Sequence, residues 1–414
     1  MINKKQFKIK FIFLFIILLI FIPLNYVFSA DESNEIDITA GSYILIDNKT
    51  NKVLCKKDEN KKMYPASTTK IVTAIMVLEN CNLDDTVTAS YDAVMSIPEG
   101  YSSANIQIGE QLSVEQLLEL LLVHSANDAA NILAEHVGGS VESFVTMLNT
   151  RLNELGISNT HFTNAFGMHD ENHYTTASDL AKIMKYCLKN ETFRKIAGKA
   201  SCAIPATNKY GPRSYSSTNE LLNSNSSNYY KYLIAGKTGY TSQAKECLVS
   251  TAYKDNLELI GVVLYSNSRF SDSRKLYEYG YSNYSIKNIV NENDLITSIK
   301  VSNATKQTED LNLLSSETIE ALVNNNSTSE IKPEISLNEN ISAPIEEGTP
   351  LGKVTYNIEG VSYTTNIIAE HSVEKSYFYL YISIGCGIII LIFVIYKLSR
   401  KKKKRTRNYR KNGF

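Results

Sequence analysis

Cysteine, proline and tryptophan are scarce in this chain of 414 residues, which has six cysteines, eight prolines and no tryptophan. Cys386 lies inside an apolar segment near the C-terminus, so an odd number of cysteines, five, remains in the rest of the chain. No two cysteines have C-x-x-C spacing. We therefore expect no dense disulfide framework. A single disulfide bridge remains an alternative, and the sequence does not indicate which two cysteines would form it. The default expectation is that the cysteines are buried free thiols.

Acidic residues are absent from both ends of the chain. Residues 1–30 and 397–414 carry 14 of the 43 basic residues and none of the 43 acidic ones. The chain between them thus has 29 basic and 43 acidic residues, a formal net charge of −14, although the whole chain sums to zero. An acidic body argues against nucleic acid as a partner. With 43% hydrophobic and 21% charged residues, a packed globular protein of more than one domain is expected.

The first apolar segment, Phe11 to Leu24, follows a lysine-bearing stretch and precedes small residues at Val27 to Ala30. This build predicts a signal peptide over residues 1–30. The alternative is an uncleaved membrane anchor. Pro23 and the shortness of the apolar run count against that alternative.

A second apolar segment, Tyr377 to Tyr396, is long enough to cross a bilayer and has tyrosines at both ends. We predict a transmembrane helix over residues 376–397 and a basic cytoplasmic tail over residues 398–414, following the positive-inside rule. The predicted location is the cell membrane, with a single pass and the folded part outside. A buried core helix is the alternative, but this run abuts a dense cluster of charges.

The chain Tyr64-Pro65-Ala66-Ser67-Thr68-Thr69-Lys70 runs into an apolar stretch that ends at Leu78. Apolar residues recur there with helical spacing, so a turn that feeds a helix is predicted. Ser67 and Lys70 would lie one turn apart on the same side of that helix. A neutral, buried lysine could take the proton of the serine hydroxyl and make it a nucleophile. By itself the S-x-x-K pattern is weak, and an exposed helix start is the plainer alternative.

Two further patterns follow. Ser125-Ala126-Asn127 is predicted to lie on a loop between two helices, where Ser125 and Asn127 could serve catalysis or merely cap the second helix. Lys237-Thr238-Gly239 ends a predicted strand, and Gly239 would let a ligand approach the strand backbone closely. A plain strand end is the alternative for this tripeptide.

Short apolar runs separated by polar turns predict an antiparallel sheet in the first domain and a second, smaller β domain after it. Apolar runs at 41–46, 52–55, 232–239, 247–252 and 257–265 are predicted to be strands. The polar break at 47–51 predicts a hairpin of the first two runs, and the turn at 254–256 predicts an antiparallel pair of the last two. Residues 31–285 are therefore predicted to form one domain and residues 286–375 a small β domain. The latter contains a hairpin, 351–358 with 361–366, and a loop-rich stretch from Asn324 to Thr349.

His169 and His173 lie in a polar loop with Asp170 and Glu171, which raises the question of a metal site. The order is not H-E-x-x-H, and no apolar period supports a helix there. We expect a structural loop, with no metal and no cofactor.

Taken together and in this order, the three motifs resemble the S-x-x-K, S-x-N and K-T-G set of penicillin-binding proteins and serine β-lactamases. The chain is most similar to the low-molecular-mass D-alanyl-D-alanine carboxypeptidases. The resemblance implies an α/β (α+β) penicillin-binding/β-lactamase-like domain with an antiparallel sheet and a helical subdomain. A small C-terminal β domain and a membrane anchor would follow it.

The resemblance also implies roles for the motif residues. Ser67 would be acylated by peptidoglycan stem peptides that end in D-Ala-D-Ala, and by β-lactams as covalent inhibitors. Lys70 would be its base, with a pKa lowered by burial and by the Lys237 ammonium. Ser125 would relay a proton to the leaving amine, and Asn127 would orient Lys70 or bind a substrate amide.

For the remaining site residues, the resemblance implies that Lys237 and Thr238 bind the terminal carboxylate beside Gly239. The backbone N–H groups of Ser67 and Tyr240 would form the oxyanion hole. Arg269 is a further candidate for the carboxylate.

Three features depart from the family pattern. Ala126 replaces a frequent glycine, Lys245 stands where a glycine is common, and the anchor is predicted to span the bilayer.

Two alternative functions remain open. A β-lactamase would need a deacylating glutamate, and 220–223 falls one residue short of E-x-x-L-N. A β-lactam sensor or wall tether without catalysis would share the fold.

Overall fold

The computed structural model describes residues 36–409, so the predicted signal peptide lies outside the described residues. A five-stranded antiparallel sheet with the strand order β2-β1-β9-β8-β7 forms the frame of the first domain. Its strands are β1 (Ser42–Asp47), β2 (Val53–Lys57), β7 (Leu233–Thr241), β8 (Lys245–Lys254) and β9 (Leu257–Ser266). The predicted antiparallel sheet is confirmed, with β1 paired to β2 and β8 paired to β9 as expected. Strand β7, which carries Lys237, lies at one edge of the sheet.

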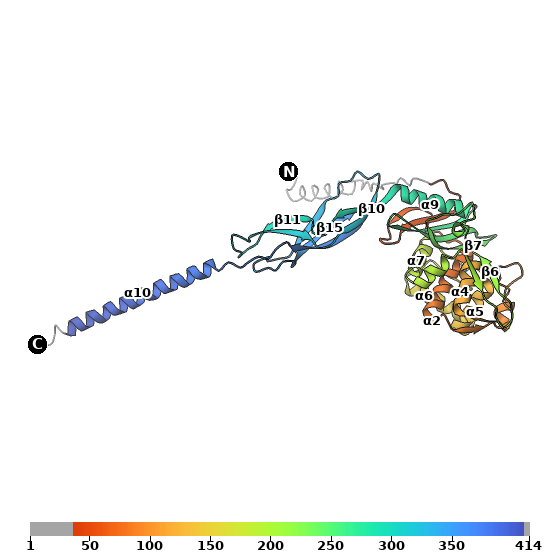
Figure 1. Ribbon diagram of the computed structural model, residues 1–414, viewed down its shortest axis with the longest axis horizontal. Helices are drawn as coiled ribbons and strands as arrows, with labels where there is room; N and C mark the ends of the chain where they lie inside the picture. Colours follow the sequence, from red (N-terminus) through yellow and green to blue (C-terminus); the bar gives the residue numbers. More distant parts are fainter. Residues whose placement is uncertain (1–35, 410–414) are drawn as a thin grey trace, which may run out of the picture. The chain divides into compact units, whose positions relative to one another are not determined.

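Helices cover both faces of this sheet (Figure 1). On one face, α9 (Arg269–Asn283) packs so closely that a Cβ on Gly280 would lie 2.5 Å from Leu259 and 2.8 Å from Leu45. The opposite face carries the remaining helices of the domain, which are α2 (Lys70–Asn80), α3 (Tyr91–Met95), α4 (Val114–Glu119), α5 (Asn127–Gly138), α6 (Val141–Glu154), α7 (Ala177–Cys187) and α8 (Glu191–Ala197). Shorter pieces are η1 (Ala66–Thr69), η2 (Leu120–His124), η3 (Glu220–Leu222), β3 (Thr86–Thr88), β4 (Gln111–Ser113), β5 (Ser201–Ile204) and β6 (Arg213–Ser216).

Helix α2 is the centre of the helical side. Its residues from Lys70 to Val77 are all buried, so the helix is enclosed on every face instead of one. The turn before it, η1, is a 3-10 helix that begins at Ala66, whose backbone is left-handed (φ 48°). Such a conformation is uncommon for a non-glycine residue and needs support from its surroundings.

The second motif lies between two helices as predicted, although Asn127 already belongs to the second helix. Helix α4 continues into the π-helical turn η2, Ser125 follows with a left-handed backbone (φ 67°), and Asn127 is already the first residue of α5. Helix α5 begins after Ala126 without a side-chain cap, so neither Ser125 nor Asn127 acts as its N-cap. Their polar groups are thereby available for other partners.

The C-terminal β domain has its own apolar core. A five-stranded antiparallel sheet has the order β11-β12-β16-β15-β14, and β10 pairs with β13. The bounds are β10 (Tyr284–Val290), β11 (Leu295–Lys300), β12 (Asp310–Ser315), β13 (Ile319–Asn324), β14 (Pro333–Leu337), β15 (Pro350–Ile358) and β16 (Val361–Ala369). The predicted hairpin is confirmed as β15 and β16. The stretch predicted to be loop-rich contains strand β14, a short edge strand that begins with a proline and is exposed along its whole length.

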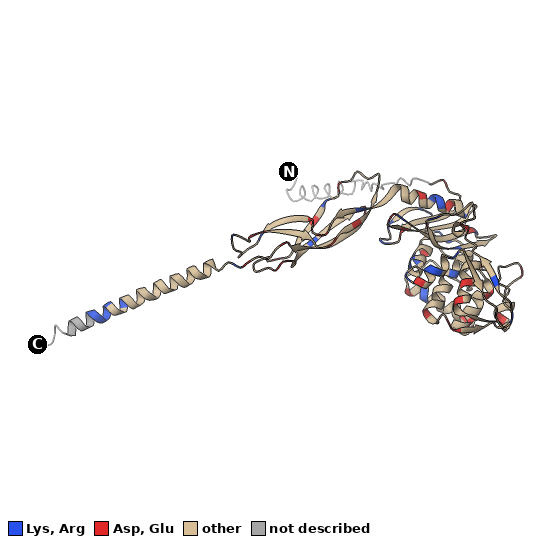
Figure 2. Ribbon diagram, in the orientation of Figure 1, with Lys and Arg blue, Asp and Glu red and all other residues tan. Residues whose placement is uncertain are grey.

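Helix α10 (Phe378–Tyr409) contains a run, Phe378–Lys403, that is long and apolar enough to cross a membrane. Its apolar side chains are exposed. Lys and Arg gather at its C-terminal end, whereas the rest of the helix is free of charge (Figure 2). This charge distribution is typical of the end of a membrane span.

The loop between α6 and α7 is packed against η1 through His173, which is 1% exposed. The Thr163 N–H donates to His173 Nδ1 (3.1 Å), so Nε2 carries the ring proton and donates to Thr69 Oγ1 (2.8 Å). Thr69 Oγ1 in turn donates to the Ala66 carbonyl (2.9 Å). A neutral imidazole therefore joins this loop to the strained turn, and both ring nitrogens are occupied.

Burial lowers the pKa of His173 from 6.5 to about 3. At a pH between 3 and 6.5, the His173 imidazole is protonated in the unfolded chain and neutral in the folded protein. The free energy of unfolding is therefore highest above pH 6.5 and falls as the pH is lowered toward 3. Between pH 7 and 4.5 the wild type should lose about 2–3 kcal/mol more unfolding free energy than the His173→Gln variant. Urea unfolding followed by circular dichroism measures this difference.

The matched control is His136→Gln, because His136 is exposed on α5. It should keep the pH dependence of the wild type. Equal pH dependence in the wild type and in His173→Gln would contradict a neutral, buried His173.

Candidate active site

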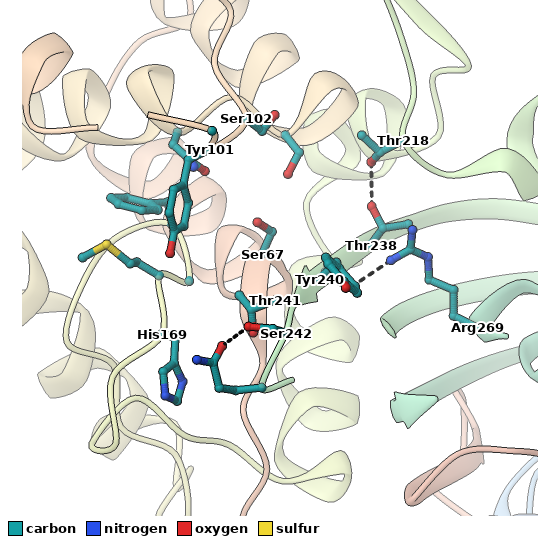
Figure 3. A pocket seen from close by; sticks show the side chains of 18 residues that line it. Ser67, Tyr101, Ser102, His169, Thr218, Thr238, Tyr240, Thr241, Ser242 and Arg269 are labelled. Atoms are coloured by element: carbon teal, nitrogen blue, oxygen red, sulfur yellow. Dashed lines mark hydrogen bonds between the residues drawn. The ribbon is translucent and has the colours of Figure 1, made fainter. Parts of the chain in front are cut away.

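A cavity of about 690 Å³ lies between the edge strand β7, the turn η1 and the start of α5 (Figure 3). Seven of the nine residues proposed from the sequence line it, namely Ser67, Ser125, Asn127, Thr238, Gly239, Tyr240 and Arg269. The other two, Lys70 and Lys237, are 0% and 1% exposed and reach these residues from within the protein. The structure thus brings all nine candidates together, although they come from four separate stretches of the chain.

Lys70 Nζ lies 2.9 Å from Ser67 Oγ, 2.6 Å from Asn127 Oδ1 and 3.0 Å from the Phe166 carbonyl oxygen. The last two atoms can only accept hydrogen bonds. If the Lys70 amine is neutral, its two N–H groups donate to Asn127 Oδ1 and the Phe166 carbonyl oxygen. The nitrogen lone pair is then directed at Ser67 Oγ. The geometry therefore suits Lys70 to take the proton of the Ser67 hydroxyl.

The pKa of Lys70 is lowered well below its ordinary value, chiefly by burial and secondly by the positive charge of Lys237. Asp128 acts in the opposite direction and partly offsets this shift. Burial also lowers the pKa of Lys237, to about 7, with the Arg269 guanidinium as the second cause. Two buried amines next to each other cannot both hold a proton cheaply, which favours one neutral and one charged lysine.

Lys237 Nζ donates to Ser125 Oγ (2.9 Å) and to the Thr238 carbonyl (2.9 Å). The left-handed backbone of Ser125 turns its hydroxyl toward this strand. A lysine N–H bonded to a hydroxyl oxygen supports transfer of the hydroxyl proton to a third group in the cavity. Ser125 is thus joined to Lys237, whereas Asn127 is joined to Lys70.

One end of the cavity is suited to a carboxylate. Thr238 Oγ1 lies 2.6 Å from Thr218 Oγ1, and an Arg269 N–H donates to the Gly239 carbonyl (2.9 Å), as Figure 3 shows. Hydroxyl donors beside Lys237 and Arg269 can bind an anion through charge-assisted hydrogen bonds. Arg269 also stiffens the strand backbone through its bond to Gly239.

Two glycines allow strand β7 and the loop between α6 and α7 to approach the turn η1, which contains Ser67. A Cβ on Gly239 would lie 2.8 Å from the Pro65 carbonyl oxygen and 3.0 Å from the Ser67 nitrogen. A Cβ on Gly167, which has φ +91°, would lie 1.9 Å from the Ala66 carbonyl oxygen. A side chain at either position would displace Ser67.

Sequence reasoning missed three contributors to this site. Phe166 acts through its main-chain carbonyl, so its side chain gave no signal. Thr218 lies in an irregular segment without a motif. His173 was considered only as a metal ligand or a loop residue, and its contact with Thr69 depends on a tertiary fold that brings distant segments together.

Comparison with known proteins agrees with this geometry. The sequence model of the D-alanyl-D-alanine carboxypeptidase family matches residues 28–268, and that of the penicillin-binding protein 5 C-terminal domain matches residues 284–375. D-alanyl-D-alanine carboxypeptidase DacF of Bacillus subtilis is 31% identical over 84% of this chain and 89% of its own length. DacC of Escherichia coli is 28% identical over 85% of this chain and 89% of its own length.

Among solved structures, penicillin-binding protein 5 of Haemophilus influenzae has a TM-score of 0.63 at 28% identity, covering 82% of this chain and 98% of that protein. Penicillin-binding protein 3 of Streptococcus pneumoniae has a TM-score of 0.67 at 25% identity, covering 81% of this chain and all of the other (100%). The penicillin-binding fold implied by the three motifs is confirmed. The chain belongs to the D-alanyl-D-alanine carboxypeptidase family.

Proposed function

We propose that this protein is a serine-type carboxypeptidase that removes the terminal D-alanine from peptidoglycan stem peptides ending in D-Ala-D-Ala. The observation that carries this proposal is the buried Lys70 amine, fixed by two acceptors with its third direction toward Ser67 Oγ. The family membership of the chain supports the same reaction.

Acylation begins when Ser67 Oγ attacks the carbonyl carbon between the two D-alanines and its proton passes to Lys70 Nζ. The developing oxyanion is bound by the backbone N–H groups of Ser67 and Tyr240. Ser125, bonded to Lys237, relays to the leaving amine the proton that Lys70 took from Ser67, so its own hydroxyl is restored and D-alanine departs. Lys70, neutral again, takes a proton from the water that attacks the ester, and that proton returns to Ser67 Oγ, which restores the free enzyme.

The substrate's terminal carboxylate binds Lys237, Thr238 and Arg269 at the anion-binding end of the cavity. Asn127 holds Lys70 in place and can donate its amide N–H groups to the peptide. β-Lactams acylate the same Ser67 and act as covalent inhibitors. Deacylation of that ester is slow, because the residues that line the described cavity include no Asp or Glu to activate water.

Helix α10 anchors the enzyme in the cytoplasmic membrane with a single pass. The Lys and Arg cluster that follows its apolar run stays on the cytoplasmic side, and the catalytic domain lies outside. A tether of this kind raises the local concentration of the enzyme at the peptidoglycan next to the membrane.

Replacing the nucleophile tests the reaction. In Ser67→Ala, D-alanine release from a pentapeptide should fall by about 10⁴-fold or more, because no other group can form the ester. Released D-alanine is the measurement. The control Ser143→Ala changes an exposed serine of α6 that does not line the cavity, and should act as the wild type does. Unchanged release from Ser67→Ala would reject the proposed mechanism.

The lysine pair predicts a pH dependence. Lys237 holds the substrate carboxylate only while protonated, and its pKa is about 7, so kcat/KM should fall as the pH rises through that value. Removing the Arg269 charge in Arg269→Gln should raise the pKa of Lys237 and move this alkaline fall to higher pH. Arg274→Gln, on the same helix but outside the cavity, should not move it.

The lifetime of the β-lactam ester separates a carboxypeptidase from a β-lactamase. We expect the covalent label on Ser67 to persist for minutes to hours after excess drug is removed, because the residues that line the described cavity include no Asp or Glu to activate water. Intact-protein mass spectrometry follows the label. Loss of the label within seconds, with hydrolysed drug accumulating, would favour the β-lactamase alternative.

A further inference from the structure

A second cavity, here called the side pocket, adjoins the catalytic one. Its volume is about 410 Å³, and its lining includes Lys61, Lys62, Tyr64, Gln243, Ala244 and Tyr265. Gln243 lines both cavities. The ring of Tyr64 also meets the ring of His169, which lines the catalytic cavity, edge to face at 4.5 Å. The two cavities therefore share a wall.

The segments around the side pocket are fixed to the catalytic machinery. Tyr64 lies three residues before Ser67, and Ala244 lies in the turn that follows strand β7. The Cys247 thiol contacts the carbonyl oxygens of Tyr64 (3.7 Å) and Ala244 (3.6 Å), which holds the two segments together. The position of the side pocket relative to Ser67 is thus set by short chain connections.

The backbone around the side pocket is unusual. Tyr265 and Lys245 both have left-handed backbones, with φ 53° and 54°, although neither is a glycine. The pairing of β8 with β9 shifts register at this point, and such a bulge turns a side chain out of the regular sheet pattern. A bulky residue keeps such a conformation only where the surrounding structure holds it there. The bulge places the Tyr265 ring in the side pocket, and Lys245 Nζ lies 5.3 Å from the centre of this ring.

The charge of the side pocket is positive. Lys61 and Lys62 line it, Lys245 lies over Tyr265, and the described residues that line either cavity include no Asp or Glu. Lys61 Nζ lies 3.9 Å from Asp58. Lys62 and Lys245 instead lie over the rings of Tyr174 (4.0 Å) and Tyr265, and neither forms an ion pair among the described residues. These two ammonium groups remain able to bind an anion.

The direction of the bound peptide follows from the proposed function. Its C-terminal carboxylate lies near Thr218, Thr238 and Arg269, on one side of Ser67, whereas His169 and Ser242 lie on another side (Figure 3). The residues before the cleaved bond therefore leave the cavity toward His169 and the turn after β7. The third residue of the stem peptide comes next to the wall shared with the side pocket.

We propose that the side pocket binds a free carboxylate on the side chain of the third stem-peptide residue. The enzyme would thereby prefer a diamino-dicarboxylic acid such as diaminopimelate over a diamine such as lysine at that position. This inference rests on the proposed function and names its substrate class. The charge comes from Lys62 in the lining and from Lys245, which lies over the Tyr265 ring at the edge of the pocket. The aromatic walls of Tyr64 and Tyr265 pack against the aliphatic part of the side chain.

Two pentapeptides that differ only in the third residue, lysine or diaminopimelate, test this proposal with the full-length enzyme in detergent. We expect kcat/KM to favour the diaminopimelate peptide by about three- to ten-fold at low ionic strength. The preference should shrink as salt is added, because these charges are partly exposed.

Variants of Lys245 sharpen the test. Lys245→Asn removes the charge with a residue that tolerates the left-handed backbone, and should lower kcat/KM for the diaminopimelate peptide only. Lys245→Arg keeps the charge and should keep the preference. Lys254→Gln, at the other end of β8, is the matched control and should change neither peptide. Equal kcat/KM for the two peptides in the wild type, or a preference that survives Lys245→Asn combined with Lys62→Gln, would overturn the proposal.

Binding separates this proposal from the proposed function. Isothermal titration calorimetry of both peptides with Ser67→Ala reports on the side pocket without turnover. Tighter binding of the diaminopimelate peptide supports the side pocket even if the wild type releases no D-alanine, in which case only the proposed function fails. Equal binding of both peptides overturns the side-pocket proposal whether or not D-alanine is released.

Discussion

Two buried lysine amines are the constraint on which the catalytic cavity depends. Lys70 and Lys237 are almost inaccessible to water, and burying either in its charged form is costly unless acceptors surround it. The fold supplies those acceptors as carbonyl, amide and hydroxyl oxygens, and no carboxylate within residues 36–409 is bonded to either amine. A carboxylate partner would hold a proton on Lys70 and prevent it from acting as a base.

Positioning those acceptors requires the helical side, the sheet and the loop between α6 and α7 to meet at one point. The loop contributes the Phe166 carbonyl, and it is held there by the neutral His173 ring and by Asn164, whose Oδ1 accepts from the Gly167 N–H (2.8 Å). The left-handed Ala66 lies against this loop, so the strain next to Ser67 is supported by contacts from a segment about a hundred residues away. The same close approach explains why glycine stands at positions 167 and 239.

Some of this site could be predicted from residue pattern. The spacing of Ser67 and Lys70 on one side of a helix start follows from local geometry, and it holds in the structure. The antiparallel sheet and the hairpin of the C-terminal domain follow from alternation and turn chemistry. Strand β14 escaped prediction, although Ile335 and Leu337 alternate with polar residues, because the strand is only five residues long and begins with a proline. Ser125 and Asn127 were predicted to lie on a loop between two helices, and the structure places Ser125 in that short link and Asn127 at the first residue of α5. Only the family resemblance suggested roles for the two side chains.

By itself, the sequence determined most of the elements, the spacing that puts Ser67 and Lys70 on one side of a helix start, and the charge separation between an acidic body and basic ends, since each depends on residues close together in the chain. Only the tertiary structure decided which lysine bonds to which serine, that a main-chain carbonyl completes the setting of Lys70, and that a second, basic cavity shares a wall with the first. The physical reason is that pKa values and cavities are set by burial and by groups distant in sequence, and neither is encoded in spacing along the chain.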